Sequence, residues 1–145
     1  MRKTLRKRKC CMSMLTEQDR DEIREMTEVS WANACLASDW NAAAALLTED
    51  VDYMPADLPL LKGRQAVREF LMDFPELREF HQAVEEVQGD ASLAVMRGTF
   101  GGTFIVEEQE VTAVGKLLCT VKKEDGHWRF AAVCWNWDAP PAPAE

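Results

Sequence analysis

The sequence predicts an α+β domain in which three N-terminal helices pack on one strongly curved, mostly antiparallel sheet. Apolar residues recur at three- and four-residue spacing as far as Pro75, and beyond it they alternate at every second residue. Turn signals at Gly89-Asp90 and at residues 124–126 separate the alternating stretches, as between consecutive antiparallel strands. Helices followed by such strands indicate one helical layer on one sheet. The 145 residues suit a single domain that buries its core without disulfides.

The first helix is expected from Thr16 to about Ser38. Thr16 followed by Asp19 resembles a capping box, with aspartate in place of the usual glutamate. The helix then presents one apolar face, which is formed by Ile23, Met26, Ser30 or Trp31, and Ala34.

Two more helices and one short strand complete the N-terminal half. Asp39 is a good N-cap for a helix over residues 41–47, whose alanine run favours close packing. Residues 51–54 predict a short strand that Pro55 ends. The third helix is expected over residues 64–74, because Pro75 cannot continue it.

Four longer strands are expected after Pro75, at residues 80–87, 91–106, 110–123 and 127–138. The last two are joined by a tight hairpin at residues 124–126. Three glycines inside the second of these strands, Gly98, Gly101 and Gly102, indicate a bend that lets the sheet curl.

The net charge of −8 is unevenly distributed. Residues 1–15 hold six of the 17 basic residues and no acidic residue, so the rest of the chain carries 11 basic against 25 acidic residues. A body that acidic repels phosphate backbones, and nucleic-acid binding is therefore not expected. The basic segment could bind an acidic partner or an anionic membrane surface; we expect a disordered arm, or upstream sequence preceding a true start at Met12 or Met14. Residues 139–145 predict a proline-rich tail without a role in the fold.

The five cysteines are odd in number and form no CxxC pair, so neither a disulfide framework nor a zinc site is expected. The two histidines are far apart, which also makes a metal site improbable, and no phosphate-binding glycine loop is present. We therefore predict no metal and no cofactor. Reduced cysteines suit the cytoplasm, and no apolar run is long enough for a transmembrane segment.

Several short motifs occur in an order that is similar to one known family. They are Trp31, Ser38-Asp39-Trp40, residues 49–55, residues 62–67, Gly115-Lys116, residues 125–128 and residues 134–138. Together they resemble the SnoaL-like branch of the nuclear transport factor 2 superfamily, which also holds ketosteroid isomerase, scytalone dehydratase and limonene epoxide hydrolase. The resemblance spans residues 16–138. It implies a cone-shaped α+β barrel with an apolar cavity open at one end, and a homodimer formed through the outer face of the sheet.

The resemblance directs attention to the short strand. In the isomerase pattern a proton-moving carboxylate stands directly before the proline, where this chain has Met54. Asp52 lies two residues earlier and so shares a strand face with Met54, whereas Val51 and Tyr53 share the other face. An inward Asp52, removed from water, would be a useful general base, and His81 on the first long strand is a second acid–base candidate. No acid stands near Val114 or Gly115, where the isomerase has its second one.

Ten residues are predicted to contact a ligand in the cavity. Trp31 matches the isomerase's oxyanion-binding tyrosine and Trp135 a cavity aromatic, while Lys116 on the neighbouring strand would need a partner such as Asp138 or Asp52. The full predicted set is Trp31, Tyr53, Met54, Phe70, Phe74, Met96, Lys116, Trp135, Asn136 and Asp138.

Three functions follow as hypotheses. The first is a pocket protein that binds a small, largely apolar molecule, such as an aromatic, polyketide-like or steroid-like compound. The second is a cofactor-independent isomerase, cyclase or hydratase in the same pocket, with Asp52 and His81 as its acid–base pair. The third is a dimeric assembly domain with a filled cavity. The direction of Asp52 and the state of the cavity discriminate among them.

Overall fold

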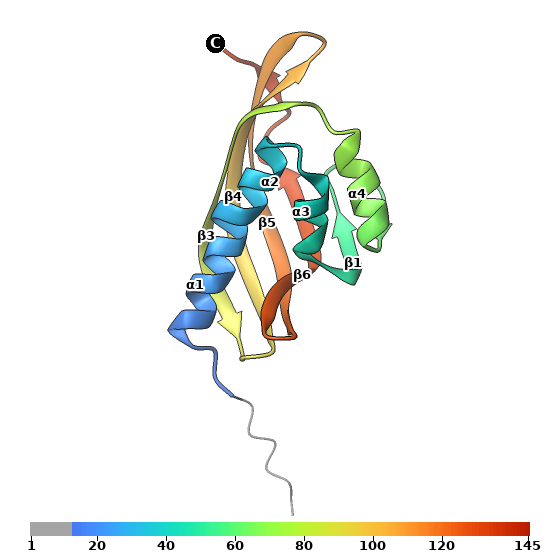
Figure 1. Ribbon diagram of the computed structural model, residues 1–145. Coiled ribbons are helices and arrows are strands. Elements are labelled where there is room, and N and C mark those ends of the chain that lie inside the picture. Colours follow the sequence, from blue (N-terminus) through green and yellow to red (C-terminus); the bar gives the residue numbers. More distant parts are fainter. Residues whose placement is uncertain (1–12) are drawn as a thin grey trace, which may run out of the picture.

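The computed structural model describes residues 13–145, which form an α+β fold with the helices across one face of a curved sheet (Figure 1). The helical elements are α1 (Glu17–Glu25), η1 (Met26–Trp31), α2 (Ala32–Leu36), α3 (Trp40–Ala45) and α4 (Arg64–Met72). The strands are β1 (Leu47–Met54), β2 (Leu61–Lys62), β3 (Leu77–Gly89), β4 (Leu93–Val106), β5 (Gln109–Glu124), β6 (His127–Trp137) and β7 (Ala142–Pro143). Because α1, η1 and α2 follow one another without a break, the described chain has three helical rods, as predicted.

The strands form one sheet in the order β2-β1-β6-β5-β4-β3, with β7 paired to β5. Every pairing is antiparallel except that of β1 with β6. The register shifts within the β1–β6, β3–β4 and β5–β6 pairs, and such irregularities bend a sheet. The predicted class and curvature are confirmed, and the sheet stays open between its edge strands β2 and β3.

The first rod contains a π-helical segment that a regular α-helical repeat does not predict. Counting four residues on from Met26 would place Ser30 on the buried face, but Ser30 is exposed and Trp31 is buried. The segment η1 adds one residue to the turn, so the separation between the buried Met26 and Trp31 is five. This extra residue is what directs the Trp31 indole toward the sheet.

Side chains of the first rod also form hydrogen bonds with backbone groups of the edge strand β3. Glu28 Oε1 accepts a hydrogen bond of 2.8 Å from the backbone N–H of Val84, at the irregularity in β3. About two turns earlier on the same rod, the Arg20 guanidinium donates to the Val87 carbonyl. Unpaired backbone groups on an edge strand invite pairing with other chains, and these two contacts pair two such groups of β3.

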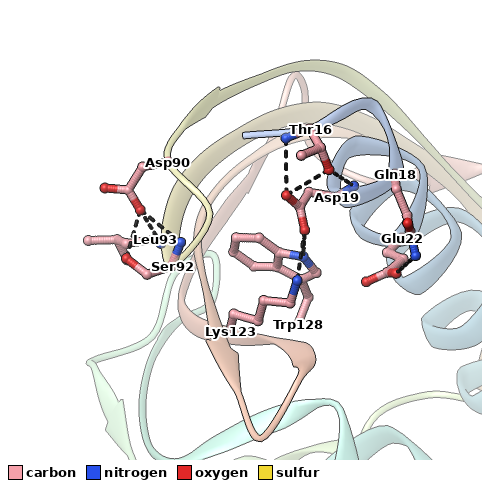
Figure 2. A network of polar contacts seen from close by, with 9 residues as sticks. All are labelled: Thr16, Gln18, Asp19, Glu22, Asp90, Ser92, Leu93, Lys123 and Trp128. Carbon is pink, nitrogen blue, oxygen red and sulfur yellow. Dashed lines mark hydrogen bonds and ion pairs between the residues drawn. The ribbon is translucent and has the colours of Figure 1, made fainter. Parts of the chain in front are cut away.

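The N-terminus of α1 is held to the sheet through Asp19 (Figure 2). The predicted capping box is confirmed: Thr16 Oγ1 accepts from the Asp19 backbone N–H, and the Asp19 carboxylate accepts from the Thr16 N–H, each at 3.0 Å. The other carboxylate oxygen accepts from Lys123 Nζ on β5 at 3.0 Å and from Trp128 Nε1 on β6 at 3.1 Å. Asp19 therefore caps its helix and joins it to two strands.

Several element boundaries differ from the sequence prediction. The first rod ends at Leu36, α3 covers Trp40–Ala45, and α4 ends at Met72 rather than at residue 74. Strand β1 begins at Leu47, four residues early, because Leu47 pairs with Phe130 of β6. Strands β3 (Leu77–Gly89) and β5 (Gln109–Glu124) are longer than predicted, whereas β4 begins two residues late and β6 ends one residue early. Such ends depend on strand partners that a local pattern does not contain.

Both predicted tails need correction where the structure describes them. Ala142 and Pro143 pair with Thr112 and Val111 of β5, so the proline-rich segment does have a role in the fold. At the other end, Met14 forms an isolated bridge with Asp90, and Leu15 packs against the core. The remainder of the predicted basic arm, residues 1–12, lies outside the described residues.

Across residues 13–145, the helices are all too short or too polar to span a lipid bilayer.

Candidate functional site

A cavity of about 70 Å³ lies between the helices and the inner face of the sheet. Its wall comes from the first rod, α3, β1, α4, the turn after α4, and strands β3 to β6. The lining residues are Trp31, Cys35, Trp40, Tyr53, Phe70, Leu71, Phe74, Leu77, Phe80, Gln82, Phe100, Phe104, Leu117, Cys119, Phe130, Val133, Trp135 and Trp137. Eleven of these eighteen are aromatic, which makes the cavity a site suited to flat, apolar molecules.

The strands supply this wall through their two-residue period. On β6, Trp135 and Trp137 share the inner face, and their rings lie 4.8 Å apart between centroids. Phe100 on β4 approaches both, at 5.6 Å from Trp135 and 5.5 Å from Trp137. Most of these contacts are edge-to-face, the arrangement that aromatic quadrupoles favour, so the rings form one continuous network.

Gly115 makes room for this network. It stands opposite Phe100 on one side and Trp137 on the other. A Cβ atom built at Gly115 would lie 2.4 Å from the Phe100 ring and 2.2 Å from the Asn136 carbonyl oxygen. The missing side chain lets the Phe100 ring lie over the strand, as close approach commonly requires of a strand glycine.

Besides the indole N–H groups of its tryptophans, the wall carries two polar side chains, Tyr53 and Gln82. The Tyr53 hydroxyl oxygen accepts a hydrogen bond of 3.0 Å from Trp135 Nε1. Burial raises the pKa of the Tyr53 phenol, so it remains protonated and can donate at neutral pH. Gln82 Oε1 is fully buried and has no hydrogen-bond partner among the described residues. These two groups are where the cavity could recognise a polar atom of a ligand.

The cavity also holds two thiols that are unsuited to nucleophilic chemistry. Burial raises the pKa of the Cys35 thiol to about 12, and it raises the pKa of the Cys119 thiol as well. A thiol is a nucleophile only as the thiolate, so both act here as small apolar side chains.

No acidic, basic or histidine side chain lines the cavity in the part of the chain that the structure describes. Over the same residues, His, Cys, Asp and Glu form no group of three that could hold a metal ion. The arrangement favours binding of an uncharged molecule, because a buried ligand charge would find no opposite charge in this wall.

A sequence model of the SnoaL-like domain matches residues 29–133. The chain belongs to this SnoaL-like family. No curated protein matches it by sequence. The match confirms the family that the motifs resemble.

Solved structures confirm the fold of this SnoaL-like chain. A ketosteroid isomerase-like protein from Erwinia carotovora atroseptica is 22% identical, with a TM-score of 0.70, covering 77% of this chain and 91% of that one. A cystatin-like protein of unknown function from Nostoc punctiforme is 19% identical, with a TM-score of 0.71, covering 88% and 96%. A hexachlorocyclohexane dehydrochlorinase from Novosphingobium barchaimii is 13% identical, with a TM-score of 0.72, covering 88% and 90%. At these identities the likeness shows a shared fold and not a shared reaction.

Five of the ten predicted ligand-contacting residues line the cavity of this SnoaL-like domain. They are Trp31, Tyr53, Phe70, Phe74 and Trp135. Trp31 and Tyr53 are buried, whereas the other three are half-buried. Whether any of them contacts a ligand stays a prediction.

Asp52 and Met54 point away from the cavity, contrary to the expectation that they face it. Asp52 Oδ1 accepts from Lys62 Nζ at 2.7 Å, and the two residues stand opposite each other on β1 and β2. The Asp52 side chain is 42% exposed and Met54 is 37% exposed. The other face of β1, with Val51 and Tyr53, is the buried one, because it carries the apolar side chains that the core requires.

His81 also lies outside the cavity. It is exposed on the outer face of β3 and stands opposite Gly101 on β4. Its ring covers this glycine, because a Cβ atom there would lie 2.7 Å from the imidazole Cε1. The neighbours Phe80 and Gln82 take the inner face instead. The structure therefore does not bring Asp52 and His81 together on the cavity.

The other predicted contacts fall outside the wall for two reasons. Lys116 Nζ donates to Asp138 Oδ1 at 2.7 Å, which is the expected partner, but both side chains are about half exposed on the outside. Asn136 is exposed as well, since it alternates with Trp135 and Trp137. Met96 is fully buried, but it lies in the packed core beyond the cavity wall.

Several lining residues were missed that strand parity could have found. Trp137 shares the face of Trp135, and Phe100 shares the face of Met96. Once β3 is set with His81 outward, Phe80 and Gln82 must point inward. For Trp40 at the start of α3 there was no such signal, because its position depends on how α3 packs.

Proposed function

We propose that this SnoaL-like protein binds a small, flat, largely apolar and uncharged molecule between the aromatic side chains of its cavity. The observation that carries the proposal is the wall itself. It combines eleven aromatic residues with two polar side chains besides the tryptophan indoles, and it holds no ionic group among the described residues. Such a wall favours ligands through area burial and ring contacts.

The size of the cavity sets a condition on binding. A cavity of about 150 Å³ holds a benzene-sized molecule, which is roughly twice the 70 Å³ available here. A ligand of two or more rings must therefore displace side chains. The half-buried rings can turn outward at the smallest cost, and among them are Phe70, Phe74, Trp135 and Trp137.

The structure offers less support for an acid–base enzyme. Asp52 is held by Lys62 on the exterior, and His81 covers Gly101 on the outer face. A general base must come within hydrogen-bonding reach of the proton that it removes, and neither residue reaches the cavity. Nor is the cavity completely filled, as a purely structural assembly domain would have it.

Tryptophan fluorescence tests the binding proposal. Four of the five tryptophans line the cavity, so a panel of aromatic, terpenoid and steroid compounds should include one that quenches saturably. Trp135→Phe should weaken that compound's affinity by about 2- to 12-fold, since the smaller ring loses apolar contact area with the ligand that contributes roughly 0.5–1.5 kcal/mol.

Trp128→Phe is the matched control, because Trp128 is the tryptophan outside the cavity and contacts Asp19. Its affinity should equal that of the wild type. A broad panel without any saturable response would contradict the proposal and favour the assembly function. Equal weakening in both variants would place the ligand outside the cavity.

We further propose that two copies of the chain pair through the outer sheet face, as the family resemblance implies. This face exposes large apolar side chains on the adjacent strands β4 and β5, with Val95 44%, Val114 57% and Leu118 54% exposed. A group of exposed apolar residues on adjacent strands is typical of a protein interface. Three thiols, Cys35, Cys119 and Cys134, are free, and they support our proposal of a cytoplasmic location.

Leu118→Lys should convert the dimer into a monomer at micromolar concentration, because the new ammonium group would be buried unpaired against the second copy. Light scattering coupled to size-exclusion chromatography measures the mass. Leu60→Lys is the control, since Leu60 is 48% exposed in the loop before β2 and lies off this face. A wild-type monomer, or a Leu118→Lys dimer, would contradict the proposed interface.

A further inference from the structure

The polar groups of the cavity restrict the chemistry of its ligand. Gln82 Oε1 is buried in a largely apolar wall and has no hydrogen-bond partner there. A buried acceptor without a donor is unfavourable, and native structures seldom leave one unless a water molecule or a ligand completes it. The cavity has the room, because one water molecule needs only about 10–15 Å³ of the 70 Å³.

The second polar group has the opposite requirement. The Tyr53 oxygen already accepts from Trp135 Nε1, so the free capacity of the hydroxyl is its own hydrogen, for which no acceptor is present among the described residues. Burial keeps the phenol protonated, as its raised pKa indicates. Beyond the indole N–H groups, the wall thus offers the Gln82 amide, whose oxygen is an unpaired acceptor, and a donor at the Tyr53 hydroxyl.

We propose that the ligand is an uncharged ring compound with a hydroxyl group that hydrogen-bonds to Gln82. This inference rests on the binding function proposed above. A hydroxyl group both donates and accepts. It therefore satisfies Gln82 whichever end of the amide faces it, whereas an ether or a ketone oxygen satisfies only the amide N–H. The hydroxyl oxygen is also the kind of acceptor that the Tyr53 hydrogen lacks.

The rest of the wall excludes the charged alternatives. A carboxylate or an ammonium group on the ligand would be buried without an opposite charge, because the described wall holds none. A pure hydrocarbon would displace any water from Gln82 and leave its oxygen unpaired. Gln82 is thus the residue that determines specificity, and the aromatic rings supply most of the affinity.

Three matched probes test this inference. Naphthalene has no polar atom, methoxynaphthalene has an ether oxygen that only accepts a hydrogen bond, and naphthol has a hydroxyl group that both donates and accepts. Calorimetry and ligand-induced shifts in melting temperature measure their binding. We expect naphthol to bind the wild type about 3- to 10-fold more tightly than naphthalene, the ratio that one net hydrogen bond supports. Methoxynaphthalene should resemble naphthalene.

The decisive variant is Gln82→Leu, which keeps the size of the side chain and removes both amide groups. It should abolish the preference for naphthol and leave the affinity for naphthalene equal or higher. Its melting temperature without ligand should not fall, because an unpaired buried acceptor has been removed. Gln88→Leu is the matched control, an exposed glutamine on the same strand, and it should retain the preference.

The outcomes separate the two proposals. If naphthalene and naphthol bind equally, or if Gln82→Leu retains the preference, the hydroxyl inference is wrong while the apolar cavity site stands. If none of the three probes binds, the binding function itself loses its support. Should Gln82→Leu fail to fold, Tyr53→Phe offers a second test, since it removes the hydroxyl donor and should reduce the naphthol preference in the same titration.

Discussion

Replacing Asp19 with alanine should lower the free energy of unfolding by about 3–5 kcal/mol, the effect of breaking a buried, hydrogen-bonded ion pair. The Asp19 side chain is only 5% exposed and accepts hydrogen bonds from Thr16, Lys123 and Trp128. Its loss would leave the Lys123 ammonium and the Trp128 indole N–H without their acceptor and would remove the cap of α1. Urea denaturation at neutral pH measures the change.

Asp21→Ala is the matched control, because Asp21 is exposed on the same helix. It should change the unfolding free energy by less than about 0.5 kcal/mol. A similar loss in both variants would show that helix propensity, and not the contacts of Asp19 with the sheet, accounts for the effect.

The same carboxylate predicts how stability changes in acid. The Thr16 backbone N–H, above all, and then the Lys123, Thr16 and Trp128 side chains lower the pKa of Asp19 far below the ordinary 3.8, against the opposing effect of burial. A lowered pKa in the folded state means that the stabilisation is fully present above the unfolded value near 3.8 and is lost as the pH falls through the folded value. Asp19→Asn cannot ionise, so its stability should fall less steeply than that of the wild type below about pH 4. If the unfolding free energies of the wild type and of Asp19→Asn fell equally steeply with pH below about 4, the lowered pKa of Asp19 would be contradicted.

Phe100→Ala should cost about 3–5 kcal/mol, as is usual when a buried phenylalanine is truncated. Phe100 is 8% exposed, and its ring contacts Phe80, Trp135 and Trp137. Removing the ring enlarges the cavity by about the size of one aromatic molecule. Benzene should therefore raise the melting temperature of the variant and leave that of the wild type nearly unchanged.

Gly115→Ala adds volume beside the Phe100 ring, whereas Phe100→Ala removes it. The added methyl group would press on the Phe100 ring and on the Asn136 carbonyl, so we expect a loss of about 1–3 kcal/mol without any rescue by benzene. If benzene stabilised both variants equally, it would be binding elsewhere than in the space that Phe100 leaves. A neutral Phe100→Ala would mean that the ring does not pack as described.

Much of the fold could be predicted from local patterns because their causes are local. Thr16 and Asp19 form their capping box within four residues, and Asp39 caps α3 through the Ala42 N–H. The change from helical to alternating periodicity near Pro75 located the boundary between helices and long strands. These signals depend on hydrogen bonds and side-chain spacing within a few residues, so no tertiary contact was needed to interpret them.

The candidate site was predictable only in part, because periodicity divides a strand into two faces without saying which of them is buried. On β1 the sequence separated Asp52 and Met54 from Val51 and Tyr53 and left the direction of Asp52 open; the catalytic hypothesis requires Asp52 to face inward, whereas the structure buries Val51 and Tyr53. On the first rod, α-helical spacing left Ser30 and Trp31 as alternatives, and the π-helical segment decided for Trp31. In both cases the burial of apolar surface against distant strands determined the direction.

The sequence by itself therefore determined the family, the α+β class and the aromatic character of the inner wall, since these follow from composition, order and local spacing. Only the tertiary structure decided that Asp52 and His81 lie outside, that Gln82 and Tyr53 are the polar groups inside, and that Gly115 gives its space to Phe100. Those outcomes depend on which strands become neighbours. Strands β1 and β6, for example, pair in parallel although they lie far apart in the sequence. Contacts between segments so distant in sequence are settled by packing the whole core, and no local pattern encodes them.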